Sequence, residues 1–95
     1  MRVDLSRYVE SDLEEIADWI GEDNPRRAVT FIREIREVFR RIGDGPLHYQ
    51  LRPDIGDDAR LAVVGNYVIL FRVDNHSVRI ERVVFGGRDL SALLQ

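Results

Sequence analysis

The sequence predicts an α+β fold: an N-terminal strand and a two-helix hairpin packed on a curved antiparallel β-sheet, with a C-terminal three-stranded meander and a short tail helix. A long amphipathic run in the first half of the chain predicts the helices, and β-rich runs separated by short turns predict the sheet. The 95 residues, 44% of them hydrophobic, are enough for one modest core. We therefore expect a single domain over residues 1–95.

The first elements are a short strand and a first helix. Residues 2–9 alternate imperfectly between apolar and polar side chains, which is typical of a strand. Residues 11–14 (Ser-Asp-Leu-Glu) match a capping box, so we expect the helix to begin at Ser11. Its buried stripe consists of Leu13, Ile16, Ala17 and Ile20. Gly21 is expected to end this helix, because glycine readily adopts the left-handed conformation.

A second helix is expected from Asn24 to Gly43. Asn24 is a favourable cap, and Pro25 at the first helical position gives up an amide that would have had no partner. One face is apolar along the whole run: Ala28, Phe31, Ile32, Ile35, Val38, Phe39 and Ile42. The other face mixes arginine and glutamate at helical spacing, and it fits either a solvated surface or a contact surface for an acidic partner.

The second half of the chain predicts a loop and a meander. Residues 43–58 are rich in glycine, proline and aspartate, which favours a loop with at most a short irregular strand. Strands are expected over residues 60–64, 67–73 and 77–85, because these runs are rich in β-branched and aromatic residues and short turns separate them. In residues 88–95, three leucines at helical spacing predict a short docked helix.

Alternation in the last strand places one cation on an apolar face. Arg82 is expected on the same side as Val78, Ile80 and Val84. An unpaired cation there would carry a desolvation penalty of several kcal/mol. We therefore expect Arg82 to pair with an acidic group and not to act in catalysis. The acid could belong to this chain or to a partner protein, and an acidic segment of a partner is the favoured source.

Composition excludes several kinds of site. The chain has no cysteine and only two histidines, so no disulfide, thiolate nucleophile, metal site or other cofactor is expected. The net charge of −3 argues against general nucleic-acid binding. Every basic residue is arginine, which suits carboxylate or phosphate binding but not proton transfer. The N-terminus lacks the apolar core of a signal peptide and no apolar run is long enough to span a bilayer, so we expect a cytoplasmic protein.

The order of these elements resembles the RelE/ParE toxin superfamily over nearly the whole chain. Residues 12–16 and 24–28 resemble the start of ParE-type toxins, and Arg60 with residues 67–72 and 82–90 resembles their second half. The resemblance implies the toxin of a type II toxin–antitoxin system, held in a hetero-oligomer by a cognate ParD-like antitoxin. It also implies growth arrest as the effect of the toxin when the antitoxin is absent.

The superfamily divides between ribosome-dependent ribonucleases that cut messenger RNA and ParE-like proteins that inhibit DNA gyrase, and the fold does not separate them. Cleavage of RNA needs a base, an acid and cations that hold the phosphate. Arg60 and Arg82 resemble the arginines of the ribonuclease site, but Phe85 stands where the family often has histidine or tyrosine. We therefore expect a gyrase inhibitor that acts by binding, and no catalytic residue. A RelE-like endoribonuclease and a non-toxic antitoxin-binding module of the same fold remain the alternatives.

Five residues are expected to contact a partner: Trp19, Arg60, Arg82, Phe85 and Arg88. Trp19 lies beside the apolar stripe of the first helix, so it is either a half-buried core residue or an anchor for the antitoxin on the helical hairpin. Arg60 and Arg82 together would make a receptor for a carboxylate or phosphate. The antitoxin is expected to supply an acidic, amphipathic tail that becomes ordered on the toxin.

Overall fold

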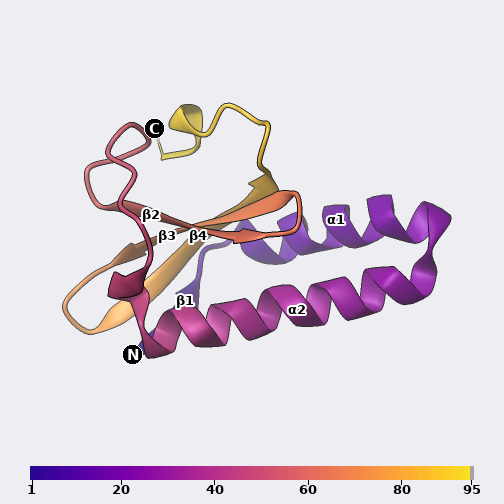
Figure 1. Ribbon diagram of the computed structural model, residues 1–95, viewed down its shortest axis with the longest axis horizontal. Helices are drawn as coiled ribbons and strands as arrows, with labels where there is room; N and C mark the ends of the chain where they lie inside the picture. The colour runs from indigo at the N-terminus through magenta and orange to yellow at the C-terminus, as the bar shows by residue number, and fades with distance from the viewer. Residues whose placement is uncertain (95) are drawn as a thin grey trace.

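The computed structural model describes residues 1–94 and confirms the predicted α+β class (Figure 1). Its elements, in chain order, are β1 (Arg2–Leu5), α1 (Val9–Asp23), α2 (Pro25–Asp44), the 3-10 helix η1 (Pro46–His48), β2 (Ala59–Val64), β3 (Tyr67–Val73), β4 (Ser77–Phe85) and the 3-10 helix η2 (Ser91–Leu94). The strands form one sheet in the order β1-β4-β3-β2. The last three strands are the predicted antiparallel meander, and the sheet is mixed because β1 pairs with β4 in parallel.

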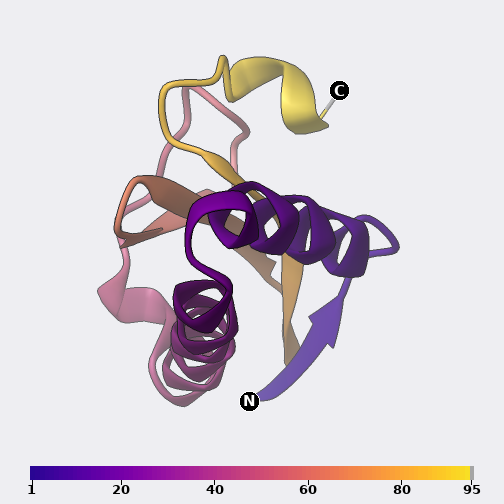
Figure 2. The ribbon, with the colours of Figure 1, turned by 90° about the vertical axis from the view of Figure 1, so that its right-hand side faces the viewer.

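The two helices lie side by side and join at the end that projects beyond the sheet (Figures 1 and 2). Asn24 is the single residue between them. Its side chain accepts the Arg27 N–H at 3.0 Å, and its own N–H donates to the Ile20 carbonyl at 2.9 Å. The predicted Asn24 cap and Pro25 start are therefore confirmed. The helices bury their apolar sides against the sheet in the main core, which includes Val9, Leu13, Ile16, Phe31, Ile35, Phe39, Ile42, Ile69, Phe71, Val78, Ile80 and Val83.

The tail covers the other face of the sheet, above it in both ribbon views (Figures 1 and 2). A second, smaller cluster forms there, in which Leu90, Leu93 and Leu94 pack against Ile55, Ala59 and Leu70. The predicted short docked tail helix is thus confirmed as η2. Within residues 1–94, no helix combines the length and hydropathy that crossing a membrane requires.

The predicted start of the first helix is wrong. Ser11 lies inside α1, which begins at Val9 with no side-chain cap, while β1 ends at Leu5. Ser6 replaces the expected capping box: its hydroxyl accepts the Tyr8 N–H at 3.2 Å and donates to the Glu81 carbonyl at 2.6 Å. A tertiary contact with β4 therefore sets the helix start, overriding the local signal in residues 11–14.

Both predicted glycine stops are also displaced. α1 continues through Gly21 to Asp23, and α2 continues through Gly43 to Asp44. The reason at Gly43 is steric, since a Cβ atom there would lie 2.7 Å from Cγ2 of Val3 in β1. This glycine permits close packing of α2 against the N-terminal strand and does not end the helix.

The two helical glycines give a matched pair of variants. Gly43→Ala is expected to lower the free energy of unfolding by about 1–3 kcal/mol, because β1 must move to admit the methyl group. Gly21→Ala is expected to raise it by about 0.5–1 kcal/mol, because its Cβ would meet Ala28 at an ordinary 3.7 Å while the helix gains propensity. Urea denaturation of both variants checks the pair, and equal stabilities would contradict the close approach at Gly43.

Candidate partner-binding groove

Asp12 ties helix α1 to strand β4. Its side chain is buried, with 5% exposed. One carboxylate oxygen accepts Nε–H of Arg82 at 2.8 Å and the backbone N–H of Val83 at 3.0 Å, and the other accepts Nη2–H of Arg82 at 2.9 Å. The hydrogen bonds that Arg82 donates to Asp12 raise the pKa of Arg82 above its ordinary value against the opposing effect of desolvation. The expected pairing of Arg82 with an acidic group is confirmed, but the acid is Asp12 of this chain and not the favoured acidic segment of a partner.

The position of Asp12 follows from the short length of β1. β1 pairs with β4 only over Ser77 to Ile80, so the outer edge of β4 loses its strand neighbour beyond that point. The N–H of Ser6 donates to the Ile80 carbonyl at 2.8 Å, and Asp12 then takes the Val83 N–H. A helix side chain thus satisfies an edge amide that another strand would otherwise bind.

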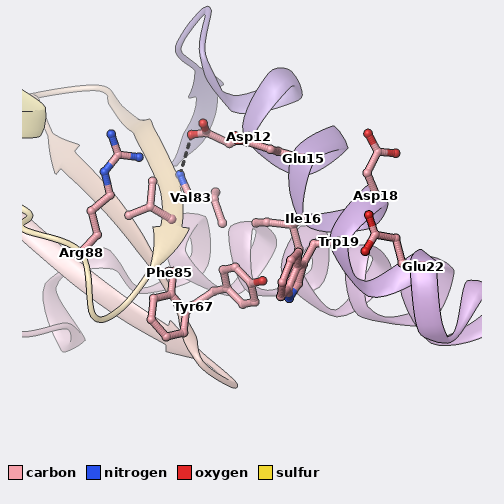
Figure 3. A pocket seen from close by; sticks show the side chains of 11 residues that line it. Asp12, Glu15, Ile16, Asp18, Trp19, Glu22, Tyr67, Val83, Phe85 and Arg88 are labelled. Atoms are coloured by element: carbon pink, nitrogen blue, oxygen red, sulfur yellow. Dashed lines mark hydrogen bonds between the residues drawn. The ribbon is translucent and has the colours of Figure 1, made fainter.

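A groove of about 410 Å³ lies between α1 and the end of β4. In Figure 3, Trp19 from α1 and Phe85 from β4 lie on either side of Tyr67, which comes from β3. Ile16 and Val83 continue the apolar lining. Tyr67 packs edge-on against Phe85 with ring centroids 6.1 Å apart, and it also packs against Phe31 of the core at 5.6 Å. The lining therefore rests on the packed interior.

Two large aromatic side chains in this groove are exposed. The exposed fraction is 69% for Trp19 and 57% for Phe85. This exposure excludes the interpretation of Trp19 as a half-buried core residue. Aromatic side chains bury large areas in interfaces and dominate their binding energies. The groove thus offers a partner an anchor on each wall.

The rims of the groove carry opposite charges. One rim is formed by three exposed acidic residues of α1: Glu15, Asp18 and Glu22. Their side chains form no ion pair within residues 1–94. Arg88, just after β4, lies on the far side from Asp18 and Glu22 (Figure 3). The Arg88 side of the groove therefore favours acidic groups, whereas the rim along α1 favours cations.

Three of the predicted contact residues, Trp19, Phe85 and Arg88, line this one groove. Arg82 supports it through Asp12, which is itself a lining residue. Arg60 lies elsewhere: it is half-buried on β2, and its guanidinium donates to the carbonyl of Tyr49. The helical hairpin contributes only α1, because no α2 residue lines the groove.

The predicted joint receptor of Arg60 and Arg82 is wrong. In the sheet register, Arg60 is opposite Phe71 and Arg82 is opposite Leu70. Phe71 and Leu70 are consecutive residues of β3, so their side chains point to opposite faces of the sheet. The two arginines consequently lie on different faces, with β3 between their strands.

A β-bulge also overturns the predicted face of Arg82. Ile80 is opposite Phe71 whereas Arg82 is opposite Leu70, so Glu81 is an extra residue in β4. The extra residue reverses the alternation, and Val83 in place of Val84 joins Val78 and Ile80 in the main core. Arg82 is therefore out of phase with Val78 and Ile80.

The carboxylates of the groove and Tyr67 were not predicted from the sequence. One signal was present, because residues 12, 15, 16, 19 and 22 recur at helical spacing and so share one face of a helix. An acid on the same face as Ile16 and Trp19 indicates a buried ion pair or a partner surface. Tyr67 gave no such signal, since an aromatic residue at a strand start is common in any sheet.

Comparison with known proteins gives two findings. Residues 3–90 match the family model described as the ParE toxin of the type II toxin–antitoxin system, parDE. The structure is also similar to a chain of a chromosomal ParDE TA system from P. aeruginosa, with a TM-score of 0.79 and 20% identity, covering 90% of this chain and 95% of that chain. No curated protein sequence matches the chain.

Proposed function

Since the chain belongs to the ParE toxin family and is the toxin of a ParDE type II toxin–antitoxin system, we propose that it inhibits DNA gyrase in the cytoplasm by binding. A ParD-like antitoxin neutralises it by occupying the groove between α1 and β4. The match over residues 3–90 supports this assignment, as it takes in both long helices, strands β2 to β4 and all of β1 except Arg2. Residues 1–95 act as one toxin domain.

The geometry of the groove supports action by binding. Within residues 1–94 its lining includes no histidine, and Phe85, at the position where the family often has histidine or tyrosine, has no group that can transfer a proton. Arg82 is held by Asp12, while Arg60 lies on the other face of the sheet and is held by the Tyr49 carbonyl. A phosphate clamp that used both arginines would require them to converge, so the arrangement weighs against the ribonuclease alternative.

The contacts with the antitoxin divide among the predicted residues. Trp19 and Phe85 supply apolar anchors, and Arg88 supplies a charged contact at the rim. Arg82 positions α1 against β4 and does not touch the partner. Arg60 lies outside the groove and takes no part in antitoxin binding.

Purified toxin is expected to inhibit supercoiling by DNA gyrase and to cause cleaved DNA to accumulate. The measurement is a supercoiling assay with relaxed plasmid, in which toxin premixed with antitoxin is the control and leaves gyrase active. Specific cuts in translated messages, with supercoiling unaffected, would establish the ribonuclease alternative instead. An absence of growth arrest on expression, together with tight antitoxin binding, would identify a non-toxic binding module.

A further inference from the structure

Strand β2 has an open outer edge near its end. β2 is the last strand of the sheet, and backbone groups in a strand point alternately to its two sides. The Ala59 carbonyl accepts the Arg52 N–H at 2.7 Å, and the Leu61 N–H donates to the Gln50 carbonyl at 3.4 Å. The same alternation directs the Leu61 carbonyl and both backbone groups of Val63 away from β3.

These groups have no partner within residues 1–94. The loop segment 50–52 covers the edge of β2 only as far as Leu61. Leu51 forms an isolated β-bridge with Arg60, and the Gln50 carbonyl accepts the Leu61 N–H. Beside this free edge, the side chain of Val63 is 72% exposed. An uncovered edge with an exposed apolar residue is a template for another extended chain.

Helix α2 flanks this edge with free cations. A groove of about 520 Å³ runs between them, lined on the helix by Arg33, Val38 and Arg41. The side chains of Arg33 and Arg41 form no hydrogen bond or ion pair within residues 1–94 and are exposed. They are eight positions apart, which is about 12 Å along a helix and close to the span of four residues of an extended strand.

The acidic residues of the same groove are already neutralised. Glu34 binds Arg27 at 2.9 Å, and Glu37 binds Arg40. The hydrogen bonds from those arginines lower the pKa of each carboxyl, so both stay ionised and paired. The charge that remains uncompensated beside the β2 edge is therefore positive.

We propose that the edge of β2 at residues 61–63 is a docking site for an extended segment of a partner protein in which acidic and apolar side chains alternate. The segment adds to the sheet as a further strand. Its acidic side chains turn towards Arg33 and Arg41 of α2, and its apolar side chains lie beside Val63 and Leu61 on the other face. A second copy of this chain fits poorly, because it would bring the same two cations. The site lies on the opposite side of the sheet order from the α1/β4 groove, so it does not depend on the proposed function.

A peptide titration tests the site. ¹⁵N-labelled toxin is titrated with a short capped peptide in which glutamate and valine alternate, and with its counterpart in which lysine replaces glutamate. Amide shifts are expected around residues 61–63, with the glutamate peptide binding about tenfold more tightly, since two exposed ion pairs contribute modestly each. Equal binding of both peptides would overturn the proposal, as would shifts confined to the α1/β4 groove. Edge shifts that depend on protein concentration without peptide would do so too, because they would identify a second copy as the occupant.

Variants separate charge from backbone pairing. Arg33→Gln combined with Arg41→Gln is expected to weaken binding of the glutamate peptide about tenfold, while Arg26→Gln, an exposed α2 arginine outside the groove, leaves it unchanged. Val63→Pro removes the outward N–H and should abolish the edge shifts, whereas Val63→Thr keeps that N–H and preserves them. If the Val63→Pro variant does not fold, the peptide affinity of the Arg33→Gln, Arg41→Gln double variant still tests the proposal. Trp19→Ala should leave peptide binding unchanged, and so distinguishes this site from the antitoxin groove.

Discussion

Replacing Asp12 by alanine is expected to lower the free energy of unfolding by about 3 kcal/mol, at the lower end of the range for breaking a buried ion pair. The change leaves the Arg82 guanidinium and the Val83 N–H without their acceptor. Arg82 is 19% exposed, so water reaches it in part and moderates the loss. Urea denaturation followed by circular dichroism measures the effect.

A control on the same helix tests whether burial is the cause. Glu10 makes a bidentate pair with Arg36 at 2.9 and 3.1 Å, but both side chains are largely exposed. Glu10→Ala is therefore expected to cost less than about 1 kcal/mol. Equal losses for Asp12→Ala and Glu10→Ala would contradict the structural role of the Asp12 link. Asp12→Asn should fall between the two, since it keeps one acceptor oxygen but loses the charge.

Replacing Trp19 by alanine is expected to weaken antitoxin binding by at least about 30-fold, equivalent to about 2 kcal/mol, as for an interface anchor. Trp19 is 69% exposed and stands at the wall of the groove, so the fold loses little packing with it. Calorimetric titration with the antitoxin gives the affinity, and circular dichroism confirms that the variant is folded.

Leu47→Ala is the matched control for this experiment. Leu47 is 67% exposed, as open to solvent as Trp19, but it lies in η1 and lines no part of the groove. Its loss should leave antitoxin affinity unchanged. A folded Trp19→Ala variant with undiminished affinity would show that the antitoxin binds elsewhere, although the family assignment would stand.

Local chemistry made much of the fold predictable. The α2 stripe, the Asn24-Pro25 junction and the tail leucines each depend on residues close in sequence, and all three were found as expected. The errors arose where distant segments meet. Ser6 is fixed by Glu81, and Gly43 is fixed by Val3, so neither the start of α1 nor the end of α2 follows from its own neighbourhood.

The candidate site was predictable only in part for the same reason. Two of the residues could be singled out from the sequence: Trp19 lies beside the apolar stripe of the first helix, and Phe85 stands where the family often has histidine or tyrosine. The structure brings both of them, with Arg88, to one groove. The extra residue at Glu81 is invisible to an alternation argument, so the face of Arg82 was assigned wrongly. Acidic residues such as Asp18 are common on any helix surface. Asp18 can be assigned to the groove only once the structure places α1 beside β4.

The parallel pairing of β1 with β4 joins residues that are 75 positions apart, since Arg2 lies opposite Ser77. The Ser6–Glu81 and Asp12–Arg82 hydrogen bonds join positions 75 and 70 residues apart. Synthesis proceeds from the N-terminus at about 5–20 residues per second, so α1 emerges seconds before the strand that holds it has been translated. Contacts of such long sequence separation also form late in folding, because the closure entropy of the intervening chain must be met first. Both walls of the α1/β4 groove therefore exist only after β4 has been synthesised, and a partner that needs both walls distinguishes a chain that includes β4 from one that stops before it.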